Sequence, residues 1–139
     1  MVQPDIKYST ELPASKDYFE LFGSTGWNGR FNLTEEQLHK AIRNSYYAVC
    51  AYEGSRLIGF GRLVSDGILH AIIYEMMILP EYQGKGIGKN ILNMLLLKCF
   101  DDGIKDIQLF CAKGKKVFYE KMGFVSRDSD APGMQYERK

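Results

Sequence analysis

The stretch "MILPEYQGKGIGKNIL" (77–92) constrains the fold more than any other part of the chain. An apolar run ends at Pro80 and a helical pattern begins near Ile87, so the glycines at 84, 86 and 88 stand between a strand and a helix. Glycine permits positive backbone angles and lets a ligand approach closely. A helix start exposes N–H groups that attract anions. The stretch therefore predicts an anion-binding turn.

Two common phosphate-binding patterns do not match this turn. A Walker A loop requires G-x-x-x-x-G-K-[ST], whereas Asn90 follows Gly88 and Lys89, and Gln83 occupies the position of the first glycine. A dinucleotide fingerprint requires G-x-G-x-x-G at the first strand of a βαβ unit, which is not the context here. A nucleotide-phosphate-binding protein is therefore the least favoured class.

Apolar periodicity and turn residues predict one domain, residues 1–139, of the α+β class. Helices are expected at 15–22, with Ser15 as N-cap, at 34–45, with a Thr34–Gln37 capping box, and at 87–102 and 115–122. Strands are expected at 5–9, 46–53, 56–64, 68–79, 106–112 and 133–138. The segment 124–127 is a candidate for a seventh strand. This gives a mixed sheet of six to seven strands with about four helices. The run 68–79 exceeds the usual strand length of about five or six residues, so a bulge is expected in it.

Composition narrows the class of protein. Eighteen basic and seventeen acidic residues leave a net charge of +1, which argues against a nucleic-acid partner. The chain has no apolar run of about 18 residues, so no membrane span is expected. Three widely spaced cysteines are read as buried, reduced thiols, which indicates a cytoplasmic location. His39 and His70 stand alone, so no metal site is expected.

The segment "QGKGIG" (83–88) resembles the [QR]-x-x-G-x-[GA] signature of the Gcn5-related N-acetyltransferases (GNAT family), with Gln83, Gly86 and Gly88 in the fixed positions. The segment "VFYEKMGF" (117–124) follows in the family's position, and two predicted helices precede the hairpin. The resemblance implies the GNAT acyl-CoA N-acyltransferase fold. It also implies an enzyme that moves an acetyl group from acetyl-CoA directly to a primary amine.

On the same resemblance, the anion is the pyrophosphate of coenzyme A. The residues implied for cofactor binding are Gln83, Gly84, Lys85, Gly86, Ile87, Gly88 and Lys89 at the turn, and Met76, Met77 and Ile78, whose backbone would pair with pantetheine. An N–H in the latter group would also polarise the thioester carbonyl. The alternative for Lys85 and Lys89 is that each is a solvated residue of a helix start.

The family's catalytic tyrosine falls on Tyr119, which would protonate the departing thiolate, and an acidic position common in the family falls on Glu75 as general base. A packed tyrosine and a solvated or salt-bridged glutamate are the structural alternatives. Tyr74 and Asp66 are weaker candidates for the base. The sequence departs from the family pattern at "KGKK" (113–116), where an asparagine is usual, and at "IQLFCA", which carries no acid.

The acceptor site is expected in the first third of the chain, with Trp27 and Phe31 as substrate-binding residues and Tyr46 as a further lining residue. Core packing is the alternative role for each. A small-molecule amine is the first choice of acceptor. The alternatives are a protein lysine or N-terminus, or a non-catalytic acyl-CoA-binding sensor domain. Members of the family often pair through sheet edges or terminal strands, so the resemblance leaves a homodimer open.

Overall fold

The computed structural model describes residues 5–138, in two compact units that divide between Gln108 and Leu109. The first unit contains β1 (Ile6–Ser9), α1 (Ser15–Gly23), α2 (Asn28–Phe31), α3 (Glu35–Arg43), β2 (Tyr47–Glu53), β3 (Arg56–Ser65), β4 (His70–Ile78), the 3-10 turn η1 (Pro80–Tyr82) and α4 (Ile87–Asp101). β5 (Asp106–Leu109) lies at the division, and the second unit contains α5 (Lys116–Lys121). The single domain expected over 1–139 stays a prediction.

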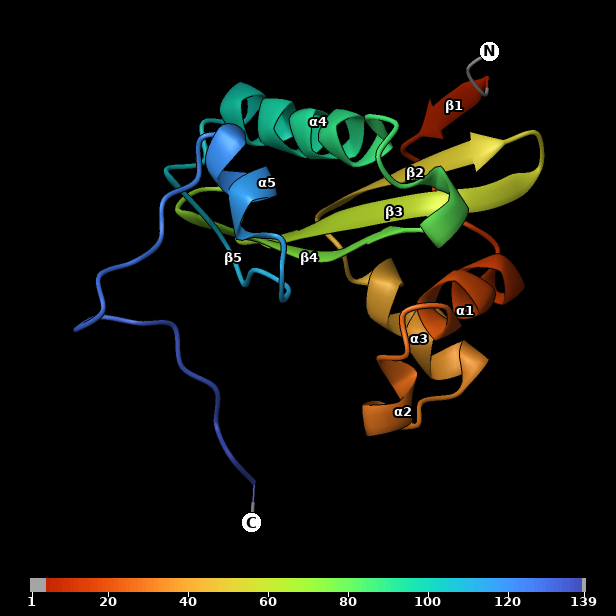
Figure 1. Cartoon of the computed structure of the whole chain (residues 1–139), viewed down its shortest axis with the longest axis horizontal. Coiled ribbons are helices and arrows are strands. Elements are labelled where there is room, and N and C mark those ends of the chain that lie inside the picture. Colours follow the sequence, from red (N-terminus) through yellow and green to blue (C-terminus); the bar gives the residue numbers. More distant parts are fainter. Residues whose placement is uncertain (1–4, 139) are drawn as a thin grey trace. The chain divides into compact units, whose positions relative to one another are not determined.

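The strands form one mixed sheet in the order β1-β2-β3-β4-β5, drawn in Figure 1. β1 through β4 pair with antiparallel neighbours. β5 begins level with the start of β4, because the Asp106 N–H donates to the Leu69 carbonyl at 2.8 Å and the Asp106 carboxylate contacts His70. The two strands therefore run parallel. This confirms the α+β class with a mixed sheet and corrects the strand count to five among the described residues.

The prediction of strands at 124–127 and 133–138 is wrong, since neither segment forms a strand in the structure. Val125, Met134 and Tyr136 are between 84% and 87% exposed, so these segments bury almost none of their apolar surface. Alternating apolar residues make a strand only where a partner covers one face. The strand expected at 106–112 also ends early, at Leu109, for which the sequence gives no stop signal.

Helices cover both faces of the sheet in the first unit (Figure 1). α4 packs on β2, β3 and β4. α1 packs on β3 and β4 from the opposite side of the sheet and also packs against α3. Side chains that are no more than 1% exposed fill both layers, among them Tyr18, Phe60, Ile91 and Leu95. Cys50 and Cys99 belong to this core, but Cys111 is exposed, which corrects the expectation that all three thiols are buried.

The predicted N-cap is correct for α3 but not for α1. The capping box at Thr34 is confirmed: its hydroxyl accepts the Gln37 N–H, and the Gln37 side chain accepts the Thr34 N–H. Ser15 is not an N-cap. Ala14 holds that position, and the Ser15 hydroxyl donates to Glu35 instead, at 3.0 Å. The short helix α2 is an addition to the expected helices, and it raises the number of helices in the described residues to five.

The bulge expected within β4 is present at Glu75. β3 pairs Phe60 with Met77 but Arg62 with Tyr74, so two residues of β4, Glu75 and Met76, stand opposite one residue of β3. Glu75 takes the left-handed conformation, with φ +49°, which a side chain adopts only at a cost. The bulge re-aims the strand just before the glycine turn.

Candidate active site

The glycine turn between η1 and α4 presents a row of free N–H groups. Gly84 and Gly86 have φ of +77° and +85°, and Gly86 is the N-cap of α4. Within the described part of the chain, the N–H groups of residues 84–89 donate to no acceptor, whereas the N–H groups on either side, those of Gln83 and Asn90, do. The exposed side chains of Lys85 and Lys89 form no ion pair with any described residue. This arrangement fits an anion with several oxygens, such as a pyrophosphate.

Side-chain hydrogen bonds fix both ends of this turn. The Gln83 amide donates to the Ile78 carbonyl at 2.9 Å, which closes the turn back onto the end of β4. The hydroxyl of the buried Tyr82 donates to Glu53 at the end of β2. On the far side, the Asn90 amide donates to the Tyr8 hydroxyl of β1 at 3.0 Å. The free N–H groups are therefore held in place before any ligand arrives.

The second half of β4 has an open edge. β5 has four residues and begins level with His70, so it ends before it reaches Met76. β3 pairs with Met77 and Ile78 on the other edge of β4. No described strand lies beside Met76, Met77 and Ile78 on the β5 side, so their backbone groups there are available to a ligand. This edge leads directly into the glycine turn.

Met76 and Glu75 point to opposite faces of the sheet. A Cβ added to Gly61 on β3 would lie 2.6 Å from the Met76 sulfur and 3.1 Å from Leu95, which places Met76 on the α4 face. Glu75 instead binds Arg62 of β3, whose guanidinium also reaches the Ala41 carbonyl of α3. The carboxylate therefore lies on the α1 and α3 face, a point that sequence alternation across a bulge does not decide.

Glu75 is salt-bridged rather than freely solvated. Arg62 Nε and Nη2 both donate to its Oε1, at 3.2 and 3.1 Å, and the two side chains are only 12% and 19% exposed. Its Oε2 is buried and has no hydrogen-bond partner among the described residues. Sequence reasoning missed Arg62, although a lone arginine in the apolar strand "LIGFGRLV" is a signal that its charge must be paired.

The two weaker candidates for the base have other surroundings. Asp66 holds the β3–β4 turn: its carboxylate accepts N–H groups of Ile68, Leu69 and His70, and these bonds lower its pKa. A lower pKa makes Asp66 a weaker proton acceptor. Tyr74 lies next to the Glu75 site, with the Arg62 guanidinium carbon 5.8 Å from its ring centre.

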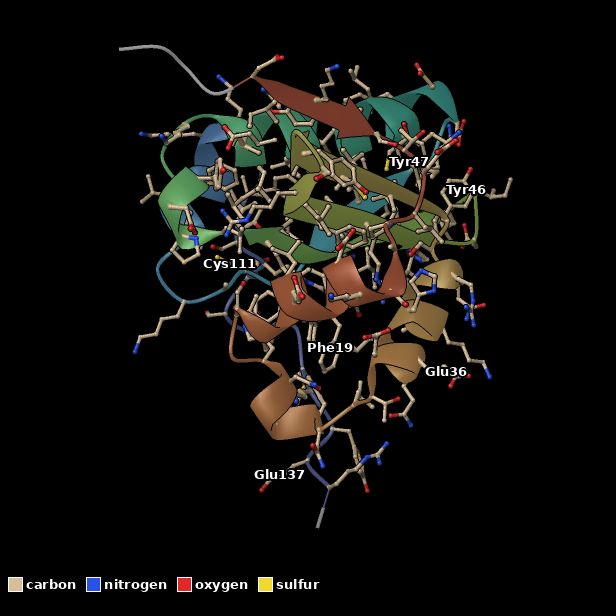
Figure 2. All side chains as sticks on the ribbon, turned by 90° about the vertical axis from the view of Figure 1, so that its right-hand side faces the viewer. Phe19, Glu36, Tyr46, Tyr47, Cys111 and Glu137 are labelled. Atoms are coloured by element: carbon tan, nitrogen blue, oxygen red, sulfur yellow. The ribbon has the colours of Figure 1, made fainter. Side chains whose placement is uncertain are left out.

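The predicted acceptor residues are not all in one place. Trp27 packs its ring against Phe22 of α1 and is 38% exposed, and Phe31 of α2 is 55% exposed, stacked by Arg30. Both lie in the α1–α3 layer, which is the layer that Glu75 faces. Tyr46 instead donates to Asp102 at the end of α4. Figure 2 shows Tyr46 and its neighbour Tyr47 apart from Phe19 of α1. Tyr46 is therefore not a lining residue of the Glu75 face.

Tyr119 lies on α5 in the second unit and is buried, at 9% exposed. Its ring makes edge contacts with Phe118 and Phe124, whose centres are 5.0 and 5.9 Å away. Burial raises the pKa of the Tyr119 hydroxyl to about 12. The hydroxyl is therefore protonated throughout the neutral range, which suits a hydrogen-bond donor.

Two other kinds of feature are absent from the described residues. No group of three or more His, Cys, Asp or Glu side chains there is arranged to hold a metal ion. No helix among them is long and apolar enough to cross a membrane.

Comparison with known proteins defines the class to which these features belong. The acetyltransferase (GNAT) domain model matches residues 43–126, more than half of the chain. A probable acetyltransferase of unknown function from meticillin-resistant Staphylococcus aureus has a similar crystal structure, with a TM-score of 0.81 and 26% identity over 96% of this chain and 100% of that one. The chain belongs to the GNAT acetyltransferase family, and the resemblance seen in its sequence is confirmed.

Its relatives carry different descriptions. It is 34% identical over 110 residues to an uncharacterized N-acetyltransferase ycf52-like from Prochlorococcus marinus, covering 76% of this chain and 59% of the relative. A histone acetyltransferase from Glycine max is 30% identical, covering 85% of this chain and 54% of the relative. A chloroplastic serotonin N-acetyltransferase from Oryza sativa is 25% identical, covering 86% and 60%. The chain spans less than two thirds of each of these relatives.

Proposed function

We propose that this protein is an N-acetyltransferase that transfers the acetyl group of acetyl-CoA directly to a primary amine, that of a small molecule. The observation that carries the proposal is the glycine turn, where the N–H groups of 84–89 and the side chains of Lys85 and Lys89 have no partner among the described residues. The open edge at 76–78 leads into this turn, which gives an extended cosubstrate arm a backbone to pair with. Membership of the GNAT family supports the same donor.

In this proposal each part of the chain has one task. The turn residues Gln83 to Lys89 bind the pyrophosphate, and Met76, Met77 and Ile78 bind the pantetheine arm through their backbone. Acetyl-CoA, when bound, supplies the thioester. An N–H at the bulge stabilises the oxyanion that develops on its carbonyl. Glu75 accepts a proton from the acceptor's ammonium group, which frees the amine lone pair for attack.

Tyr119 supports the departing thiolate as a hydrogen-bond donor. With its pKa raised to about 12, full proton transfer to a thiolate of pKa about 8.5 would be uphill by about 5 kcal/mol. A hydrogen bond that strengthens as charge grows on sulfur avoids that cost. The attacking nitrogen loses its second proton to solvent as the amide forms, and solvent supplies the proton of the departed thiolate. The role is narrower than the protonation expected from the family resemblance.

The acceptor class is part of the proposal. Two aromatic side chains, Trp27 and Phe31, are exposed in the layer that Glu75 faces, which supports an amine with an apolar or aromatic body. The rice relative named a serotonin N-acetyltransferase points the same way. The soybean relative named a histone acetyltransferase favours the second candidate, a protein lysine.

The first experiment measures free thiol released from acetyl-CoA with a panel of acceptors: tryptamine, spermidine, lysine, kanamycin and a lysine-containing peptide. CoA-induced thermal stabilisation is measured in parallel, because a ligand at about a hundredfold over Kd raises stability by about 2.7 kcal/mol. We expect stabilisation and turnover on tryptamine. Turnover confined to the peptide would establish the protein-lysine alternative. Stabilisation without any turnover would indicate an acyl-CoA sensor, and no stabilisation would overturn the assignment of the glycine turn.

Three further expectations belong to the same proposal. The whole chain, 1–139, acts as one N-acetyltransferase domain. The compartment is the cytoplasm, although two relatives are named as chloroplastic. A homodimer follows from the family resemblance alone, and light scattering of the purified chain measures it.

A further inference from the structure

The carboxylate of Glu75 is held by one arginine, and that arginine is held in turn by α3. Arg62 donates to Oε1 through Nε and Nη2 at 3.2 and 3.1 Å. Its Nη1 donates to the Ser45 hydroxyl at 3.3 Å and to the Ala41 carbonyl at 3.4 Å. A guanidinium carries its donors in a fixed planar fork, so these contacts leave the Glu75 side chain little freedom.

The two oxygens of this carboxylate differ. Both contacts from Arg62 fall on Oε1, while Oε2 is buried and has no partner within the described residues. A buried acceptor without a donor costs stability, and such atoms are rare in folded proteins. The side chain as a whole is 19% exposed, and the terminal torsion of a glutamate is broad. Oε2 is therefore the oxygen of this carboxylate that is left to accept a hydrogen bond from a ligand.

Arg62 is the cation in this group. The titratable and charged side chains that face the carboxylate are Arg62 from β3, Tyr74 from β4, whose ring lies against Arg62, and Tyr18 from α1. Arg62 compensates the charge of Glu75 in a place where both side chains are largely buried. The backbone adds a constraint, since Glu75 sits in the strained left-handed conformation at the bulge.

We propose that Arg62 is a positioning residue, which occupies Oε1 of Glu75 and so leaves Oε2 to receive the ammonium group of the acceptor, directly or through one water molecule. The inference rests on the proposed N-acetyltransferase function. It specifies what that site recognises: a protonated primary amine that arrives from the α1 and α3 face. One proton then passes from the ammonium nitrogen to Oε2, and the neutral amine keeps its lone pair.

The test compares steady-state kinetics of variants on the best amine of the panel above. Arg62→Met should lower kcat/KM for the amine by about 30-fold, while the KM for acetyl-CoA stays within about twofold. Arg62→Lys, which keeps the charge but not the fork, should lie between Arg62→Met and the wild type. Ser45→Ala removes one support of Arg62 and should lower kcat/KM by about threefold. Arg43→Met is the control, since Arg43 is an exposed arginine at the end of α3 that contacts His39 and not Glu75.

A double-mutant cycle separates positioning from a general structural role. In a Glu75→Gln background, Arg62→Met should change kcat/KM for the amine by less than about threefold, because the group that Arg62 positions is already gone. This double variant also removes both charges, so it serves where Arg62→Met alone does not fold. Two results would overturn the inference. One is a double variant whose loss of kcat/KM equals the product of the two single losses, and the other is an unchanged kcat/KM for the amine in Arg62→Met. A wild-type protein without turnover would remove the proposed function itself and this inference with it.

Discussion

At the level of single residues, the backbone decides what Glu75 does. Its φ of +49° and the two-against-one register at the bulge put its side chain on the same face as that of Tyr74, the residue before it, since both contact Arg62. Without the bulge, neighbours in a strand would alternate regularly and the register would continue. Strained conformations of this kind persist only where the surrounding structure holds them, and they cluster at functional sites. The contact with Arg62 is what holds Glu75 here.

Tyr119 gives a prediction at the same level. Tyr119→Phe should lower kcat by about 10- to 100-fold and leave the KM for acetyl-CoA within about twofold, because the hydroxyl acts only when charge appears on sulfur. Its raised pKa, about 12, means that the hydroxyl is protonated below that pH, so its ionisation should cause no fall in kcat between pH 7 and pH 10. A pH series of kcat for both proteins measures this.

Tyr136→Phe is the matched control for Tyr119→Phe. Tyr136 also lies in the second unit but is 87% exposed, so losing its hydroxyl should leave kcat unchanged. Equal activity of Tyr119→Phe and the wild type would exclude Tyr119 from the chemical step and leave it as a packed core tyrosine.

At the level of elements, the glycine turn and α4 form one unit with two unlike ends. Gly86 begins α4 with φ +85°, and Gly103 follows its last turn with φ +71°. The Gly103 N–H donates to the Phe100 carbonyl, and the Ile104 N–H donates to the Cys99 carbonyl. The same left-handed backbone geometry therefore occurs beside free N–H groups at the start of α4 and beside hydrogen-bonded carbonyls at its end. The turn therefore owes its proposed role to position, not to glycine alone.

Gly86→Ala tests this role of the turn. A Cβ at position 86 would meet no atom within 4 Å, so the substitution acts through the positive φ, at a cost of about 1–2 kcal/mol. Relaxing that strain moves the neighbouring N–H groups, and we expect the Kd for CoA to rise about tenfold by calorimetry. Gly103→Ala meets the same empty space and a similar φ, so it should lose similar stability and keep the Kd for CoA. Equal CoA affinity in both variants would contradict the proposed pyrophosphate site.

At the level of the whole molecule, the two-sided core carries groups that titrate in alkali. Burial raises the pKa of the Cys50 thiol from 9.0 to about 12, and it also raises the pKa of Tyr18. A group whose pKa is raised by folding stabilises the fold below its unfolded pKa, and the contribution is lost as pH rises toward the folded value. The free energy of unfolding should therefore fall from about pH 9 upward.

Cys50→Ala isolates one part of this alkaline loss. At pH 10.5 the shifted pKa of the Cys50 thiol should make the free energy of unfolding of the wild type about 2 kcal/mol lower than at pH 8. The reason is that pH 10.5 lies about 1.5 units above the ordinary pKa of the thiol. The variant is less stable at every pH but should lose about 2 kcal/mol less over that interval, measured by urea unfolding. Cys111→Ala, which removes an exposed thiol, should keep the wild-type pH slope. Identical slopes for Cys50→Ala and the wild type would show that this thiol does not ionise on unfolding.

The sequence by itself determined the features that rest on local interactions. The capping box at Thr34, the long helix after the glycine turn, and the need for a bulge in a twelve-residue apolar run all follow from neighbouring residues, and all three are confirmed. The GNAT motif is local in the same sense. Spacing and backbone freedom are properties of a short stretch, so they can be predicted without the rest of the chain.

Only the tertiary structure decided how distant residues meet. Arg62 and Glu75 are thirteen positions apart, and Ser45 is seventeen from Arg62, yet the three side chains form one cluster. The expected strands at 124–127 and 133–138 do not form, because the alternation of Val125 or Tyr136 has no partner to bury it. Tyr46 was expected at the acceptor site but pairs with Asp102, 56 positions away. Long-range pairing depends on the packed fold, which sets side chains against one another irrespective of their distance along the chain.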